Sequence, residues 1–156
     1  MMPQVLIVLG SKSDAEIGKK AQAILQRFDV SSSMHVASAH RTPERVKKLV
    51  TESDAEVFIA VAGLSAALPG VVASITTRPV IGVPVSGGVN LDSILSIVQM
   101  PPGIPVAAVG LDRGDNAALL AVEMIAIREP RLREELARYR LEMVEKVERD
   151  SEELNR

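Results

Sequence analysis

Short runs of consecutive apolar residues alternate along this chain with segments in which apolar residues recur every three or four positions. The first pattern is typical of strands buried on both faces of a parallel sheet, and the second is typical of helices that pack on a sheet. Their alternation predicts an α/β fold with a doubly wound parallel sheet. The runs that we expect to form strands are residues 5–9, 34–37, 57–62, 80–85 and 106–111.

Capping residues indicate where the helices begin. Ser13 is expected to cap a first helix that begins near Asp14, with Glu16 completing a capping box. Thr42 is expected to cap a second helix, because Pro43 follows it and proline is favoured at the first helical position. Three more helices are expected over residues 65–76, 91–98 and 116–127.

The chain changes character at Arg128, where mixed charge becomes dense. The pattern predicts one long amphipathic C-terminal helix with a narrow apolar stripe. Such a helix either lies solvated on its own domain or packs on a neighbouring subunit, and the second interpretation explains the stripe better. With no internal repeat or linker, we expect one catalytic domain over residues 1–156, in which 128–156 pack on a neighbouring subunit. The stripe consists of Leu132, Leu136, Tyr139, Met143 and Val147.

Composition narrows the possible functions. The 156 residues carry a net charge of −2, which provides no broad basic surface for nucleic acid. Without cysteine there is no disulfide, thiolate metal site or cysteine nucleophile, in agreement with a reducing compartment. The apolar stretches are short, and the N-terminal residues lack the pattern of a signal peptide. We therefore expect a cytoplasmic protein with neither a membrane nor a nucleic acid as its partner.

In open α/β sheets, ligands bind beyond the carboxyl ends of the strands. The first strand is followed by a turn of small residues, 10–14, that leads into a helix start, where free N–H groups favour an anion. Ser11 and Ser13 offer hydroxyl donors and Asp14 offers an acceptor for a sugar hydroxyl, although a plain helix cap also explains Ser13 and Asp14. The turn matches neither the Walker loop nor the G-x-G-x-x-G motif, so it gives no indication of ATP or NAD.

The second strand is followed by a histidine and an arginine, His40 and Arg41, just before a capped helix. Arg41 can bind a phosphate with its planar guanidinium, and His40 can exchange a proton near neutral pH because an unperturbed histidine has a pKa of about 6.5. The other histidine of the chain, His35, lies inside a predicted strand, where we expect a structural role.

Two further loops follow the third and fourth predicted strands. Residues 62–70 are mostly small, so the backbone can approach a ligand closely, but tight packing of a helix on the sheet explains them equally well. Residues 84–90 form a glycine-rich segment that is either a lid, a subunit contact or a simple crossover loop.

Taken together, these segments resemble the PurE family, the N5-carboxyaminoimidazole ribonucleotide mutases, in order and spacing through Ile127. The resemblance implies a flavodoxin-like, three-layer α/β/α domain that assembles into a homo-octamer. It implies conversion of N5-carboxyaminoimidazole ribonucleotide (N5-CAIR) to 4-carboxy-5-aminoimidazole ribonucleotide (CAIR) in purine biosynthesis, with no metal and no other cofactor. The matching motifs are GSKSD at 10–14, SAHRTP at 38–43, ALPG at 67–70, GVPV at 82–85, DSILSIVQMPPGIPVA at 92–107 and NAALLA at 116–121.

The resemblance also implies a role for each site residue. His40 is the implied general acid and base, and the backbone of residues 63–68 is the implied pocket for the carboxylate and the imidazole ring. Ser11, Ser13 and Asp14 would contact the ribose and phosphate end of the ribonucleotide, while Ser38 and Arg41 would hold the phosphate. The complete implied substrate site is Gly10, Ser11, Ser13, Asp14, Ser38, Ala39, Arg41, Gly63, Leu64, Ser65, Ala66, Ala67 and Leu68.

One position departs from the mutase pattern. Mutases usually read GGAAHLPG where this chain reads GLSAALPG, so Ala67 stands in place of a second histidine. The branch of the family that carboxylates aminoimidazole ribonucleotide (AIR) directly with CO2 also lacks that histidine and has a serine at the position of Ser65. Three interpretations stay open: a divergent mutase, a direct carboxylase, or a mutase with an engineered change. A non-catalytic nucleotide-binding domain is a further alternative, but Gly63 and Leu64 stand where receiver domains place a phosphoacceptor aspartate.

Overall fold

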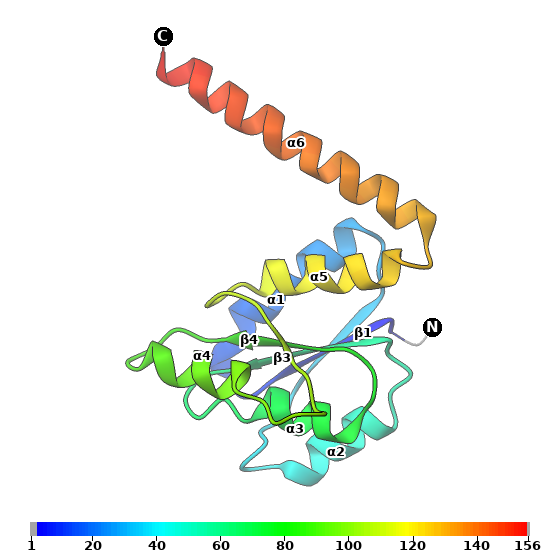
Figure 1. Ribbon diagram of the computed structural model, residues 1–156, viewed down its shortest axis with the longest axis vertical. Coiled ribbons are helices and arrows are strands. Elements are labelled where there is room, and N and C mark those ends of the chain that lie inside the picture. The colour runs from blue at the N-terminus through cyan, green and yellow to red at the C-terminus, as the bar shows by residue number, and fades with distance from the viewer. Residues whose placement is uncertain (1–2, 156) are drawn as a thin grey trace. The chain divides into compact units, whose positions relative to one another are not determined.

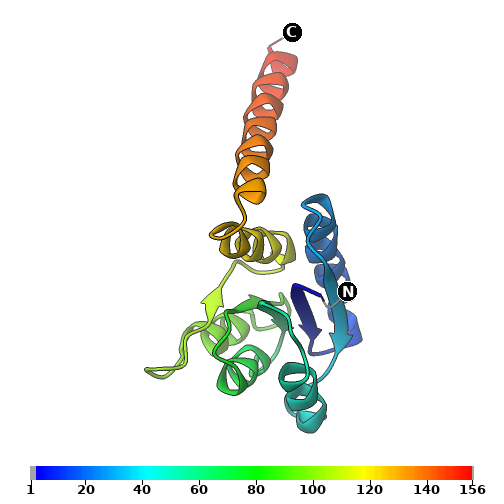
Figure 2. The ribbon, with the colours of Figure 1, turned by 90° about the vertical axis from the view of Figure 1, so that its right-hand side faces the viewer.

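The computed structural model describes residues 3–155, and the chain divides into two compact units, Met1–Ala121 and Val122–Arg156. The first unit is built on a five-stranded parallel sheet. Helices lie on both faces of this sheet, as Figures 1 and 2 show. The order of the strands is β2-β1-β3-β4-β5, the flavodoxin-like order. The predicted three-layer, doubly wound α/β fold is therefore confirmed. The strands are β1 Val5–Leu9, β2 Ser32–Val36, β3 Val57–Ala62, β4 Val80–Pro84 and β5 Ala107–Ala108.

The register of the sheet brings the strand ends to one edge. β1 pairs in parallel with both β2 and β3, so Leu9 lies opposite Val36 on one side and Val61 on the other. β3 pairs with β4 in the same direction, with Ala62 opposite Pro84. The chain runs outward from β1 to β2 and then returns to β3 on the far side of β1. Such a reversal of strand order leaves a crevice beyond the carboxyl ends of the two central strands.

Helices cover the two faces of the sheet in two groups. Alternate residues of β1 and β3, including Leu6 and Phe58, belong to one buried cluster with residues of α2, α3 and α4. On the opposite face, Gly18 of α1 packs so closely that an added Cβ would lie 3.0 Å from Leu9. The helices are the 3₁₀ turn η1 Lys12–Asp14, α1 Ala15–Arg27, α2 Pro43–Thr51, α3 Leu68–Ile75, α4 Asn90–Val98, α5 Gly114–Ala126 and α6 Pro130–Leu154.

The two edge strands differ most from the expected apolar runs. β2 begins at Ser32, and none of its residues is fully buried, because it has a neighbouring strand on one side only. β5 is limited to Ala107–Ala108. Beyond it, Val109 N–H donates to the Gly82 carbonyl and Asp112 N–H donates to the Pro84 carbonyl. The two donors are three residues apart whereas their acceptors on β4 are two residues apart, so the regular ladder of hydrogen bonds ends here.

The helix starts were predicted to within a few residues, but the capping chemistry was wrong in two places. Ser11, not Ser13, caps the first turn: its side chain accepts from Ser13 N–H, and Asp14 closes the capping box. Thr42 precedes α2 as expected, but its hydroxyl bonds to the Ser38 backbone and makes no cap to the helix. α3 begins at Leu68 and not at residue 65, because Ser65 has a φ of 50°, outside the helical region.

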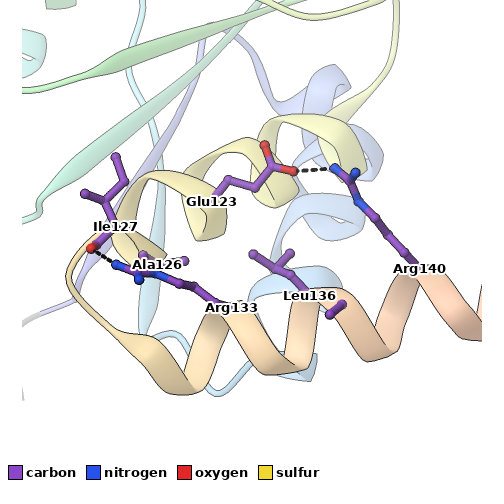
Figure 3. Close-up of a pocket in the computed structure, with 7 residues that line it drawn as sticks. Glu123, Ala126, Ile127, Arg133, Leu136 and Arg140 are labelled. Carbon is purple, nitrogen blue, oxygen red and sulfur yellow. Dashed lines mark hydrogen bonds and ion pairs between the residues drawn. The ribbon is translucent and has the colours of Figure 1, made fainter.

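The second unit contains the end of α5, a turn and the long helix α6, which begins at Pro130 and not at Arg128. Figure 3 shows how Arg133 turns back to the end of α5 and the residue that follows it: its Nε lies 2.6 Å from the Ala126 carbonyl oxygen, and its Nη2 donates to the Ile127 carbonyl. Arg133 lines a hollow of about 510 Å³ between the end of α5 and α6. Arg140 and Glu123 also line this hollow and form an ion pair of 2.9 Å. These contacts join the end of α5 to the first half of α6.

The apolar stripe of α6 divides into two halves within this unit. Leu132 is completely buried and Leu136 lines the hollow beside α5, whereas Met143 and Val147 are exposed. The far half of the helix therefore presents apolar side chains that its own unit does not cover. Over residues 3–155, the helices include none that combines the length and apolar character needed to cross a membrane.

We expect Gly114→Ala to destabilise the first unit. A Cβ at Gly114 would lie 2.1 Å from the carbonyl oxygen of Ile17, so α5 would have to move away from α1. Overpacking of this kind typically costs about 1–3 kcal/mol of unfolding free energy. Urea denaturation measures the loss. The control is Gly88→Ala, because an added Cβ there meets no atom within 4 Å. Equal stability of the two variants would contradict the close approach of α5 to α1.

Candidate active site

A cavity of about 380 Å³ opens beyond the carboxyl ends of β1, β2 and β3. It lies where the strand order reverses, as expected for a ligand site in an open α/β sheet. The structure brings together here every residue that the sequence placed in the substrate site, although their roles stay predictions. The lining residues are Gly10, Ser11, Ser13, Asp14, Ser38, Ala39, His40, Arg41, Ala62, Gly63, Leu64, Ser65, Ala66, Ala67 and Leu68.

The turn after β1 forms one wall of the cavity around a buried carboxylate. Asp14 is only 6% exposed, and its Oδ2 accepts from Ser11 N–H at 3.1 Å while its Oδ1 accepts from the Ser13 hydroxyl at 3.3 Å. Burial raises the pKa of Asp14 above its ordinary value of 3.8, and the hydrogen bonds from Ser11 and Ser13 oppose that rise. Asp14 thus orders the turn and keeps a carboxyl group at the edge of the cavity.

Arg41 connects the turn after β2 to the turn after β1. Its Nη2 lies 3.2 Å from the Gly10 carbonyl oxygen, and its Nε lies 3.4 Å from Ser38 Oγ. Ser38 Oγ also accepts from the Arg41 backbone N–H at 3.2 Å. A guanidinium has five N–H donors, and these contacts use two of them. The remaining donors are available to an anion, because the side chain is exposed at the cavity.

His40 lies between Ala39 and Arg41 in the same turn and is exposed at the cavity. An imidazole in this place can reach a ligand in the cavity while staying in contact with solvent protons. His35 lines a different hollow, with Arg45, Lys48 and Glu52 among its neighbours. The two histidines of the chain therefore lie in different hollows.

The loop after β3 forms the opposite wall. Ser65 adopts a left-handed conformation with a φ of 50°, and its N–H donates to the Asp92 carboxylate of α4. Ala66 is buried, and Ala67, at the position of the missing histidine, is half-buried at the start of α3. The side chains that this loop brings to the cavity are small except for Leu64 and Leu68.

Two residues of this region were not assigned to the substrate site by the sequence analysis. Ala62 begins the run of small residues 62–70 and lines the cavity as the last residue of β3. Asp92 contacts the cavity loop from the first turn of α4, and no spacing in the sequence indicates that contact. Within residues 3–155, no three His, Asp or Glu side chains are grouped so that they could hold a metal ion.

The sequence of this chain matches that of a known protein family. The family model described as AIR carboxylase matches residues 4–146. The chain belongs to the AIR carboxylase family. A protein of Methanocaldococcus jannaschii named N5-carboxyaminoimidazole ribonucleotide mutase is 56% identical over 144 residues, covering 92% of this chain and 92% of its own. A protein of the same name from Pyrococcus abyssi is 53% identical over 147 residues, covering 91% of this chain and 84% of its own.

Solved structures of the family have the same fold as this chain. The crystal structure of a variant of Treponema denticola PurE2 superposes with a TM-score of 0.90 at 29% sequence identity and covers 100% of both chains. A structure of Treponema denticola PurE gives 0.88 at 29% identity, over 97% of this chain and 98% of that one. The family identification made from the sequence motifs is confirmed.

The buried carboxylate of this AIR carboxylase family member gives a prediction about pH. The folded-state pKa of Asp14 is raised, so the folded protein holds a proton more tightly than the unfolded chain does. The stability that Asp14 contributes is complete below pH 3.8 and is lost as the pH rises through the folded-state pKa. We therefore expect the unfolding free energy of the wild type, minus that of Asp14→Asn, to fall between pH 3 and neutral pH. Urea titrations at several pH values measure this difference.

Glu16→Gln is the control with the opposite sign. The hydrogen bond and charge of Lys19 lower the pKa of Glu16, so its contribution is present above its ordinary pKa of 4.5 and is lost as the pH falls. The difference between wild type and Glu16→Gln should rise with pH. A difference for Asp14→Asn that also rises would show that its carboxylate is stabilised, not penalised, by the fold.

Proposed function

We propose that this protein is an N5-carboxyaminoimidazole ribonucleotide mutase of purine biosynthesis, which converts N5-CAIR to CAIR. The observation that carries the proposal is the cavity at the β1/β3 reversal, which gathers a histidine, an arginine and a buried aspartate within about 380 Å³. The relatives at 56% and 53% identity bear the mutase name. The enzyme class that follows is an isomerase.

The phosphate end of the ribonucleotide binds between the turns after β1 and β2. Arg41 supplies unused guanidinium donors, and Ser38 lies within hydrogen-bond distance of that guanidinium. Arginine suits this task because its planar donors match phosphate oxygens. Asp14 accepts from a ribose hydroxyl, and Ser11 and Ser13 stand beside it. A protein with a net charge of −2 has no general attraction for a phosphate, so these local donors must hold it.

The chemistry moves a carboxyl group from the exocyclic nitrogen to ring carbon C4. The N–C bond of the carbamate breaks and leaves its electron pair on nitrogen, which makes C4 nucleophilic, and C4 then attacks the released CO2. His40 takes the proton from C4 and returns one to the exocyclic nitrogen, which becomes the free amine of CAIR. The small side chains of the loop after β3 let the cavity close around the ring and the CO2, which limits its escape to water.

Assembly and location form part of the same proposal. The exposed apolar residues of α6, including Met143 and Val147, support packing of residues 128–156 on a neighbouring subunit of a homo-octamer. Sedimentation of the full chain measures the subunit number. Residues 1–156 then act as one catalytic domain within that assembly, in the cytoplasm, on a small ribonucleotide. Neither a membrane nor a nucleic acid is a partner in this proposal.

The donor of the carboxyl group is the first test. Purified protein should form CAIR from N5-CAIR, and much more slowly from AIR with bicarbonate. Ala67 and Ser65 give this comparison its purpose, because the direct carboxylases also lack a histidine where Ala67 stands and have a serine where Ser65 stands. Product formed only from AIR with bicarbonate would make the protein a direct AIR carboxylase. Absence of product from both mixtures would refute both activities.

His40→Asn tests the proton transfer. Asparagine keeps a polar side chain of similar size but cannot exchange a proton near neutral pH, so turnover should fall on the order of 10²–10⁴-fold. Nucleotide binding, measured by calorimetry, should persist because Arg41 and Ser38 are unchanged. His35→Asn is the matched control, since His35 lies outside the cavity, and it should keep wild-type turnover. Full activity of His40→Asn would remove His40 from the mechanism.

A further inference from the structure

The loop after β3 is joined to α4 by a hydrogen bond from a backbone amide to a carboxylate. Ser65 N–H lies 2.5 Å from Oδ2 of Asp92, 27 positions later in the chain. Ser65 lines the cavity, whereas Asp92 does not. The contact therefore connects the wall of the cavity to a residue outside it.

Ser65 needs an external partner because of its backbone conformation. Its φ of 50° lies in the left-handed region, which residues with a Cβ rarely occupy. Ala67 N–H donates to the Ser65 carbonyl in a tight turn, and the neighbouring Leu64 side chain is 78% exposed, so it contributes little packing. The bond to Asp92 is thus the contact best placed to keep Ser65 in this conformation.

Asp92 is held in place by the hydrogen bonds of the residue that follows it. It belongs to the first turn of α4, and the next residue, Ser93, is 1% exposed. Ser93 Oγ lies 3.1 Å from the Val85 carbonyl oxygen and 3.0 Å from that of Asn90, and its proton can be donated to either. These bonds fix the start of α4 to the end of β4, so the Asp92 carboxylate stands at a defined position above the sheet edge.

The opposite end of the segment that precedes α4 is anchored as well. Ser86 N–H lies 2.8 Å from Oδ1 of Asp112, and the Ser86 hydroxyl donates to the other oxygen of that carboxylate. Between the anchors, Gly87 and Gly88 have no atoms within 4 Å of where a Cβ would stand. Asp92 therefore connects the cavity loop to a firmly attached part of α4 and not to the open tip of residues 86–89.

We propose that Asp92 is a positioning residue for the reaction: it holds the loop of residues 63–68 in the shape that surrounds the migrating carboxyl group. This inference rests on the proposed function. Without the carboxylate, Ser65 would leave the left-handed conformation for part of the time, and the wall opposite His40 would open. CO2 released from the carbamate would then escape more often, and the nitrogen left behind would take up a proton to give AIR.

Asp92→Ala removes the acceptor and tests the proposal. A hydrogen bond to a charged group corresponds to roughly a tenfold to hundredfold effect, and we expect kcat for CAIR formation to fall within that range. The ratio of AIR to CAIR among the products should rise, and exchange of the Ser65 amide with solvent, followed by NMR, should accelerate. Asp92→Asn keeps an acceptor oxygen and should stay close to wild type in all three measurements.

Asp115→Ala is the matched control. Asp115 is also an aspartate in the first turn of a helix, but its partners are Arg113 and Asn116, outside the cavity. Its removal tests whether loss of a helix-terminal charge alone lowers activity. Equal losses of kcat in Asp92→Ala and Asp115→Ala, with an unchanged product ratio, would overturn the proposal.

Ser65→Gly provides a second, independent test. Glycine adopts a positive φ without the steric cost of a Cβ, so the loop should depend less on Asp92. The factor by which Asp92→Ala lowers kcat should be smaller in a Ser65→Gly background than in the wild type, and a double-mutant cycle measures this difference. An equal loss in both backgrounds would overturn the proposal.

The outcomes separate this inference from the proposed function. Wild-type protein without mutase activity would refute the function, and the amide exchange of Ser65 would still show whether Asp92 holds the loop. If Asp92→Ala does not fold, Asp92→Asn provides the test, because asparagine keeps the acceptor oxygen. Exchange of the Ser65 amide that is faster than in the wild type, together with a higher ratio of AIR to CAIR, would then contradict the acceptor role of Asp92. An active wild type whose Ser65 amide exchanges equally fast with and without Asp92 would refute the positioning role alone.

Discussion

Parallel pairing of β1 with both of its neighbours is the constraint on which the site depends. Leu9 lies opposite Val36 and Val61, so three strands end at the same level and their following turns meet. Burial of β1 and β3 on both faces makes this register costly to shift, because a slip of one residue would turn every buried side chain to the other face. The cavity is therefore a consequence of how the apolar runs pair, and its polar residues are added to a rigid edge.

Polar contacts within the site complete what the sheet begins. Burial raises the pKa of Asp14, but both of its carboxylate oxygens accept hydrogen bonds. Arg41 links the turns that follow β1 and β2. Over residues 3–155, no buried side-chain nitrogen or oxygen lacks a hydrogen-bond partner. Because their buried polar groups are satisfied in this way, the turns after β1 and β2 keep their shape without a ligand, so little binding energy is consumed in ordering them.

The loop after β3 distinguishes this chain from the usual mutase pattern. Ala67 replaces a histidine, so the loop supplies only small and aliphatic side chains and backbone groups opposite His40. In the proposed reaction this leaves His40 as the imidazole that lines the cavity. A wall of small residues has few polar groups of its own to fix its position, which gives the bond between Ser65 and Asp92 its importance.

The apolar pattern was sufficient to predict the central strands, because β1 and β3 are buried on both faces and have the bounds that their runs indicated. The motifs after the strands were sufficient to collect the residues of the cavity, since parallel strands bring their carboxyl ends to one edge. Local patterns failed where partners distant in sequence decide the structure. β2 lost its burial by lying at an edge, which no pattern within its own residues indicates. The first cap was misassigned locally, because Ser11 and Asp14, and not Ser13 and Glu16, form the capping box. Only the folded chain brings Asp92 to Ser65, because a hydrogen bond across 27 residues depends on how two crossovers pack on the sheet and leaves no periodicity to detect.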